Sequence, residues 1–415
     1  MAGSIPEITS CEVCGNTRLE AAIDLGLHPM CDDLVKVGDG RICREYPIDI
    51  LFCDVCRTAH QRFQVPKREL FPQDYHYRSR FTADVLRGME QLAQSVEQEL
   101  GSLKGLKVLD IGCNDGSLLG MFQAHGASTI GIEPTGAAQD AIERGHAVYN
   151  DYLGDAVAER IVAEHGKPDI ITFTNVFAHI ENLGEVIGSL KLLMKPETLL
   201  VIENHYLGAV LDGNQFDTFY HEHPRTYSMT SFEHIARSLG VVVAKAEFVV
   251  RYGGNIRVFM RAAPLPGTAN ASNLDEVRQR EAGFGARFEQ MRANVLNWQT
   301  RKKREIEALV KEHGPLYGKA FPGRAAILVK LLGLDETVIA GVFEKPGSLK
   351  IGHYLPGTRI PILSDDDLFA MAKQPPVLVN FAWHIPAEIH GYLKNNGFSG
   401  TVVDIISADD FKTVD

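Results

Sequence analysis

The chain has 415 residues, more than one ordinary domain requires, so about two to three domains are expected. Hydrophobic residues make up 45% of the chain and charged residues 23%, as in other globular proteins. The net charge of -11 argues against nucleic-acid binding, which needs clustered cations to neutralise phosphates. The sequence contains neither an apolar run of the roughly 20 residues that span a bilayer nor a secretion signal. We therefore expect a cytoplasmic monomer whose partners include neither a membrane nor a nucleic acid.

Four of the seven cysteines form two Cys-x-x-Cys pairs near the N-terminus, Cys11 with Cys14 and Cys53 with Cys56. Each pair can direct both thiolates at one ion, and two pairs complete a tetrahedral Zn²⁺ site. The alternative is two independent buried or redox-active pairs. Because protein ligands would fill all four positions, the pattern predicts a structural zinc ion.

A connector with an aromatic cluster around Tyr75 follows the cysteine pairs. Its side chains can either pack the first module onto the next domain or line a ligand cavity at a domain junction. The sequence leaves these two interpretations open. An amphipathic helical pattern then runs over 82–103.

An apolar strand beginning at Lys107 breaks into a glycine-containing turn and then a helix. Gly112 and Gly116 lack Cβ atoms where a ligand would approach the carboxyl edge of a parallel sheet. Asn114 stands where many such loops carry glycine, and asparagine tolerates a positive φ better than most residues. The segment therefore predicts a Rossmann-like nucleoside site.

A second strand ends in an acid, Glu133, which can accept hydrogen bonds from both ribose hydroxyls of an adenosine. The loop differs from the Gly-x-Gly-x-x-Gly of dinucleotide folds, which disfavours a pyrophosphate ligand. The Asp-x-Gly-x-Asn-x-Gly loop followed by this acid resembles the class I S-adenosylmethionine-dependent methyltransferases; the alternative is a Rossmann domain for another nucleoside. The resemblance implies a cofactor site that comprises Asp110, Gly112, Asn114, Glu133, Pro134, Asp151, Tyr152 and Asn175.

Ionisable and phenolic side chains follow the expected fifth strand, in the run from Tyr220 through Glu222 to His223. His179 follows the fourth strand. Imidazole and phenol groups can transfer protons, and a carboxylate can orient a histidine. The alternative is a structural or metal-binding cluster, but His-Glu-His lacks the helical spacing of a metallopeptidase site.

Two later β segments, 241–250 and 255–262, are expected to close the sheet with antiparallel strands. The segment 274–312 then has the pattern of a long connecting helix. Apolar segments beyond it suggest a second, smaller α/β domain. The predicted fold is therefore α/β, with a Rossmann-like domain flanked by a zinc module and a C-terminal α/β domain. The predicted boundaries are 1–72, 73–272 and 273–415.

Four motifs occur together in this chain: the cysteine pairs, Tyr-His-Glu-His, a glycine pair framed by Arg251 and Arg257, and a glycine-rich motif from Lys350 to Pro361. With them the chain resembles, over essentially its whole length, the deoxysugar C-3′-methyltransferases exemplified by the tetronitrose enzyme. The resemblance implies methylation of the carbon beside the ketone of a nucleotide-linked 4-keto-6-deoxysugar. Tyr252 and the segments 319–324 and 383–386 depart from the family pattern, so the nucleotide base and the sugar stay open.

The resemblance and the chemistry together suggest a role for each reactive side chain. We predict His223 as the base, Tyr220 as the enolate stabiliser or proton relay, and Glu222 and His179 in support, with Tyr75 lining the sugar site. An O- or N-methyltransferase acting on a nucleotide sugar is the rival enzyme. A non-catalytic sensor of S-adenosylmethionine is the rival of another class.

Overall fold

The computed structural model describes residues 5–71, 78–81, 83–251, 253–262 and 271–411. The chain divides into two compact units, each described by itself below. The first contains residues 1–21, 51–213 and 222–285, and the second contains 22–50, 214–221 and 286–415. The predicted domains are three consecutive segments of the chain, whereas each compact unit combines segments that are distant in the sequence. None of the helices in the described ranges is long and apolar enough to cross a membrane.

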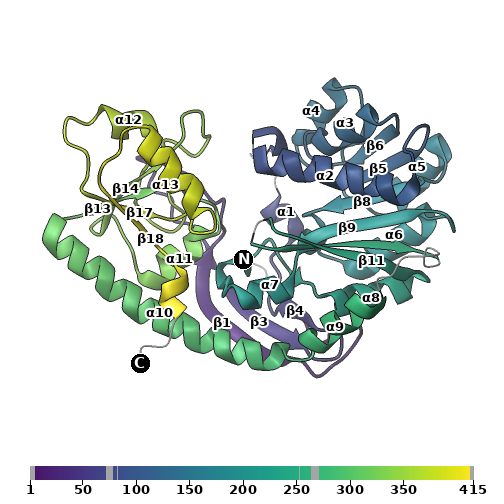
Figure 1. Ribbon diagram of the computed structural model, residues 1–415, viewed down its shortest axis with the longest axis horizontal. Coiled ribbons are helices and arrows are strands. Elements are labelled where there is room, and N and C mark those ends of the chain that lie inside the picture. Colours follow the sequence, from purple (N-terminus) through teal and green to yellow (C-terminus); the bar gives the residue numbers. More distant parts are fainter. Residues whose placement is uncertain (1–4, 72–77, 82, 252, 263–270, 412–415) are drawn as a thin grey trace. The chain divides into compact units, whose positions relative to one another are not determined.

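The first unit is built on a seven-stranded sheet in the order β11-β12-β9-β8-β5-β6-β7 (Figure 1). Five strands are parallel, and β12 and β11 close the sheet antiparallel, as the sequence predicts. The strands are β5 (Lys107–Ile111), β6 (Ser128–Ile132), β7 (Ala147–Tyr149), β8 (Ile170–Thr174), β9 (Leu199–His205), β11 (Val242–Val249) and β12 (Asn255–Arg261).

The helices of this unit alternate with the strands and share their core. Leu92 and Val96 of α2 and Phe122 of α3 pack with Val108 of β5 and Phe259 of β12 in one buried cluster. The helices are α1 (Lys67–Leu70), α2 (Ala83–Leu100), α3 (Ser117–Ala124), α4 (Ala137–Glu143), α5 (Asp155–His165), α6 (Leu183–Leu193), α7 (Leu207–Asp212), α8 (Met229–Leu239) and α9 (Ala271–Glu281), with 3-10 turns η1 (Ser79–Phe81) and η2 (Phe177–His179).

Two short strands of the first unit lie outside this large sheet. β4 (Thr58–Gln61) pairs antiparallel with β10 (Arg225–Thr226). The longer strands β1 (Glu20–Pro29) and β3 (Glu45–Cys53) pass from one unit into the other. The sequence signals for β10 are too short to predict it.

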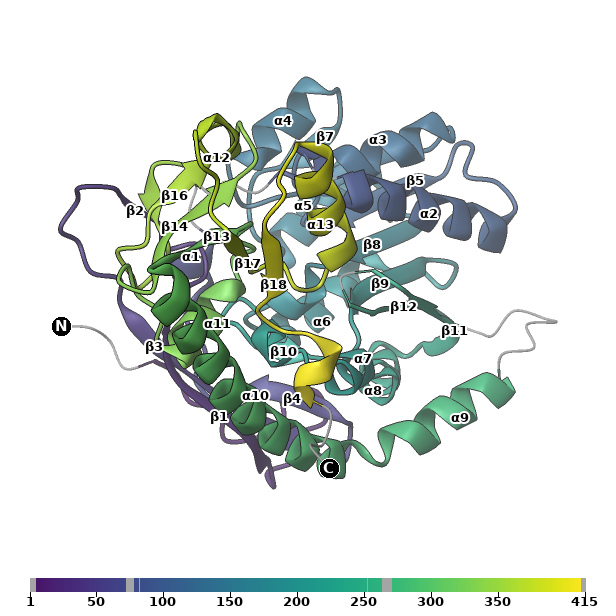
Figure 2. The ribbon, with the colours of Figure 1, turned by 60° about the vertical axis from the view of Figure 1, so that its left-hand side comes forward.

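The second unit contains a parallel sheet of five strands in the order β16-β14-β13-β17-β18 (Figure 2). The smaller α/β domain predicted from the sequence is therefore present, with a central strand, β13, that no clear sequence pattern marks. The strands are β13 (Leu316–Lys319), β14 (Ile339–Glu344), β16 (Ile362–Ser364), β17 (Val377–Asn380) and β18 (Thr401–Asp404), and β2 (Val35–Lys36) pairs with β15 (His353–Tyr354).

The single long helix expected over 274–312 is instead two helices, because α9 ends at Glu281 and α10 (Phe284–His313) begins after a turn at Ala282 and Gly283. α10 buries Trp298, whose indole N–H donates to the carbonyl of Ile405 at 2.8 Å. The remaining helices are α11 (Ala325–Leu332), α12 (Asp365–Ala370) and α13 (Pro386–Asn395), with 3-10 turns η3 (Phe216–Thr218) and η4 (Ala408–Phe411).

Candidate active site and zinc module

Each cysteine pair lies on a tight turn closed by a backbone hydrogen bond. The N–H of Gly15 donates to the carbonyl of Cys11, and the N–H of Arg57 donates to that of Cys53, both at 2.8 Å. Gly15 and Arg57 both have positive φ, 77° and 59°. The two turns are thus built alike, and each presents two sulfurs on one side.

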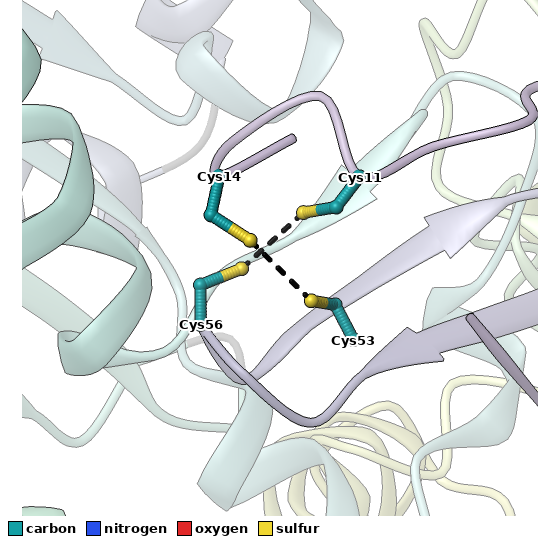
Figure 3. Close-up of side chains that lie close together, drawn as sticks. All are labelled: Cys11, Cys14, Cys53 and Cys56. Carbon is teal, nitrogen blue, oxygen red and sulfur yellow. Dashed lines mark hydrogen bonds between the residues drawn. The ribbon is translucent and has the colours of Figure 1, made fainter. Parts of the chain in front are cut away.

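The four sulfurs face one another (Figure 3). The Sγ atoms of Cys11 and Cys56 lie 3.3 Å apart, those of Cys14 and Cys53 lie 3.6 Å apart, and all four lie within 4.8 Å of one another. A tetrahedral ion with Zn–S bonds of about 2.3 Å would place its sulfurs about 3.8 Å apart. The cluster therefore fits Zn²⁺, with every ligand position filled by protein.

Three polar side chains surround these sulfurs and were missed from the sequence. Nδ2 of Asn16 donates to Cys53 at 3.4 Å, Oγ1 of Thr58 lies 3.0 Å from Cys56, and Nε2 of His60 lies 3.3 Å from Cys11. Such neighbours orient metal-binding thiolates and stabilise their charge. All three lie within four residues of a cysteine pair, and this closeness in the sequence could have identified them.

The loop after β5 has the backbone that its sequence predicts. Gly112, Asn114 and Gly116 all have positive φ, 75°, 49° and 75°. A Cβ added to Gly112 would lie 2.5 Å from the side chain of Val176, and one added to Gly116 would lie 2.9 Å from the Cβ of Ala141. Close protein packing therefore requires both glycines, whereas the sequence interpretation assigned their missing Cβ atoms to ligand passage.

The two predicted acids lie at the carboxyl ends of β5 and β6. Glu133 accepts hydrogen bonds from the N–H of Asn114 at 3.0 Å and from the N–H and hydroxyl of Thr135 at 2.8 and 2.6 Å. Asp110 is buried and accepts a hydrogen bond from Thr172 at 2.7 Å. Burial raises the pKa of Asp110 to about 7, opposed by the Thr172 bond and assisted by the Glu133 charge.

Asp151 and Tyr152 follow β7 at the same edge. Asp151 is exposed, and the phenol of Tyr152 bonds to the carbonyl of Phe71 at 3.3 Å, with the ammonium of Lys67 4.6 Å from its ring centre. Nδ2 of Asn150 donates to the carbonyl of Glu133 at 2.7 Å, which ties this loop to the acid and to the adjoining Pro134.

A segment just before α2 contacts the loop after β5 and was not predicted. The N–H of Ser79 donates to Oδ1 of Asn114, and the N–H of Arg80 donates to Asp115, both at 3.0 Å. The guanidinium of Arg80 also lies 3.1 Å from Asp140. These contacts join parts of the chain that are distant in the sequence, so no local sequence pattern predicts them. Tyr75, predicted to line the sugar site, lies outside the described residues.

Asn175 directly follows β8 and has a positive φ of 55°. Its N–H donates to the carbonyl of Glu203 at 2.7 Å, and its side-chain oxygen accepts from Asn255 at 3.1 Å. The Glu203 carboxylate is buried between Arg251 and Arg257. The two arginines that frame the glycine pair thus form ion pairs with Glu203, the residue whose backbone carbonyl accepts the hydrogen bond from Asn175.

Three of the predicted reactive side chains are brought together in the first unit. Nδ1 of His179 lies 3.9 Å from Oε2 of Glu222, and the rings of His179 and His223 are nearly perpendicular with centres 4.9 Å apart. His205, at the end of β9, was not singled out from the sequence, yet its ring centre lies 5.6 Å from that of His223. Burial lowers the pKa of His179 to about 4, so this imidazole is neutral near pH 7.

The boundary between the compact units divides the reactive run. Tyr220 and His221 belong to the second unit, where Nε2 of His221 lies 3.1 Å from the carbonyl of Tyr46. Burial lowers the pKa of His221 to about 4. Within the first unit the cluster therefore consists of His179, Glu222, His223 and the additional His205.

Family models match three successive parts of the chain. A domain described as proposed to bind zinc matches residues 11–71, a methyltransferase domain matches residues 76–246, and a C-methyltransferase C-terminal domain matches residues 251–403. The four-cysteine cluster lies within the first match and the donor loop within the second. The predicted fold class, the zinc module and the methyltransferase domain are confirmed.

Individual relatives match over very different lengths. The C-methyltransferase NovU of Streptomyces niveus is 27% identical over 408 residues, 96% of each chain. The ubiquinone biosynthesis O-methyltransferase of Rhodopseudomonas palustris (strain BisA53) is 35% identical over 109 residues, 25% of this chain and 42% of that protein. Magnesium protoporphyrin IX methyltransferase from Synechocystis PCC 6803, with bound SAH, has a TM-score of 0.34 at 17% identity, covering 43% of this chain and 84% of that one.

Proposed function

We propose a substrate and a reaction for this chain, which is an S-adenosylmethionine-dependent methyltransferase similar over 96% of its length to the C-methyltransferase NovU. In our proposal it transfers a methyl group to C-3′ of a nucleotide-linked 4-keto-6-deoxysugar through an enolate. The observation that carries the proposal is the cluster of His179, Glu222 and His223, because methylation of the carbon beside a ketone needs a base to remove the C–H proton. The same residues could supply a base for oxygen or nitrogen methylation, and the match to a C-methyltransferase C-terminal domain is what favours carbon.

The donor site that we propose follows the carboxyl edge of the sheet in the first unit. S-adenosylmethionine supplies an activated methyl group on a sulfonium. In our proposal Glu133, which is held by Asn114 and Thr135, accepts a hydrogen bond from the ribose. The remaining proposed contacts come from the same loops, namely Asp110, Gly112, Pro134, Asp151, Tyr152 and Asn175.

The methyl transfer requires an acidic C–H bond beside the ketone. In our proposal His223 removes the proton from C-3′, and the electron pair moves to the C-4′ oxygen to form the enolate. Tyr220 donates a hydrogen bond to that oxygen or relays the proton. The carbanion carbon then takes the methyl group, and S-adenosylhomocysteine leaves with the electron pair of the broken S–C bond.

The charges in the cluster suit a proton on His223. Because burial keeps His179 neutral near pH 7, a protonated His223 would meet no second cation on that neighbour. The Glu222 carboxylate in the same cluster would stabilise the imidazolium. His179 and Glu222 therefore support the base by orientation and charge.

Hydrogen exchange at C-3′ tests this proposal separately from methyl transfer. With S-adenosylhomocysteine bound in D₂O, wild type should wash deuterium into C-3′ of the 4-keto sugar, because deprotonation does not need the methyl group. His223→Asn should lose exchange and lower turnover by about a hundred- to ten-thousandfold, the range for a general base. His390→Asn, at an exposed histidine of α13, is the control and should behave as wild type. Exchange at the wild-type rate in His223→Asn would show that the base lies elsewhere.

A further inference from the structure

The residues that follow His223 are bonded directly to the zinc module. In the pairing of β10 with β4, Arg225 lies opposite His60 and Thr226 lies opposite Ala59. The N–H of Gln61 also donates to the carbonyl of Pro224, the residue next to His223, at 2.8 Å. Strand β4 begins two residues after the second cysteine pair. The backbone beside the histidine cluster therefore depends on the position of this pair.

The side chain of Arg225 makes a second connection, to the first cysteine pair. It is fully buried, and its Nη1 donates to Oε2 of Glu12 at 2.5 Å. Glu12 lies between Cys11 and Cys14, and its carboxylate is also bonded to Gln64 at 2.7 Å. The buried Arg225 thus forms an ion pair with the partly exposed Glu12 inside the first cysteine pair.

The same guanidinium reaches the loop that carries His179. Its Nη2 donates to the carbonyl of Ile180, and both terminal nitrogens lie 3.4 Å from the carbonyl of Glu181. Its Nε donates to the hydroxyl of Tyr227 at 2.9 Å. A planar group with five fixed donors can hold these acceptors at once, whereas an ammonium cannot match that geometry.

The second cysteine pair is also anchored, at the start of α8. The hydroxyls of Ser228 and Ser231 donate to the carbonyl of Cys56 at 3.3 and 3.1 Å. These two serines form the capping box of α8. The segment from His223 to Ser231 is therefore fastened to the zinc module at both ends.

We propose that Arg225 is a positioning residue that fixes the positions of His179 and His223 relative to the zinc module. The guanidinium of Arg225 joins Glu12 of the first cysteine pair to the carbonyls of Ile180 and Glu181, which follow His179. Arg225 itself lies two residues after His223 in the chain. The zinc module then serves the reaction by fixing two imidazoles, in addition to stabilising the fold. The role in catalysis rests on the proposed function of His223, whereas the geometric claim stands on the contacts above.

The test compares Arg225→Lys and Glu12→Gln with Tyr227→Phe, which removes one acceptor of Arg225 and leaves both connections intact. Full-length, zinc-loaded proteins are assayed for zinc content, donor affinity, kcat and KM. Enzyme labelled with ¹⁵N-histidine gives imidazole spectra, in which His179 and His223 are assigned through His179→Gln and His223→Gln. We expect Arg225→Lys to keep zinc and donor affinity, to shift both imidazole signals, and to lower kcat about a hundredfold, as expected for a misplaced base. Glu12→Gln should show the same changes more weakly, and Tyr227→Phe should match wild type.

Wild-type imidazole signals and wild-type kcat in Arg225→Lys would overturn the proposal. If that variant does not fold, Glu12→Gln decides, and unchanged signals with unchanged kcat overturn it equally. A wild-type enzyme that makes no C-methylated product would contradict the proposed function. The imidazole spectra would still report whether Arg225 positions the histidines.

Discussion

Glu133 is oriented by three hydrogen bonds from the protein, one from Asn114 and two from Thr135. A carboxylate oxygen has two lone pairs. Oε1 already accepts both bonds from Thr135, whereas Oε2 accepts only the one from Asn114 and can accept a further bond from a ribose hydroxyl. The left-handed conformation of Asn114, with φ of 49°, is what directs its N–H at the acid. The donor loop and the acid after β6 therefore act together.

Replacing Glu133 should weaken the donor site specifically. In the proposed site, Glu133→Ala removes a charge-assisted hydrogen bond to the ribose, with a net value of about 1.5–3 kcal/mol. We expect at least a tenfold rise in the Kd for S-adenosylmethionine, measured by calorimetry, with the affinity for the sugar nucleotide unchanged. Glu143→Ala, on the exposed side of α4, is the control. An unchanged donor Kd in Glu133→Ala would mean that the cofactor site is elsewhere.

The zinc module is the element whose sequence signal is most complete. The short spacing within each cysteine pair determines a local turn, and the ligands could therefore be named from the sequence alone. The contacts of β10 and Arg225 could not be predicted in this way, because a two-residue strand has no hydrophobic period and its partners are remote in the chain. Strand β13 was missed because four residues containing Gly318 give no clear strand pattern.

Removing one zinc ligand tests the module. Cys53→Ser should lose the metal and unfold at a lower temperature, because a structural zinc site contributes binding free energy to folding. Metal analysis of wild type should give about one equivalent of zinc per chain. Cys43→Ser is the control, since Cys43 is buried but lies outside the cluster. Retention of one zinc ion by Cys53→Ser would show that another ligand set holds it.

At the scale of the whole molecule, the order of strands and helices was predictable because alternating apolar strands and amphipathic helices specify a parallel sheet. The division into compact units was not predictable, since 22–50 and 214–221 pack with the C-terminal part of the chain. Tyr220 and Glu222 are close in the sequence, yet they belong to different units. Their shared role in one reaction therefore stays a prediction.

The structure of the product shows whether the methyl group is transferred to carbon. The full-length enzyme is supplied with ¹³C-methyl S-adenosylmethionine and a uniformly ¹³C-labelled nucleotide-linked 4-keto-6-deoxysugar, and the product is examined by NMR. We predict a one-bond ¹³C–¹³C coupling between the new methyl carbon and C-3′, because the enolate attacks through that carbon. A labelled methyl group without a one-bond carbon coupling, as on oxygen or nitrogen, would contradict the account.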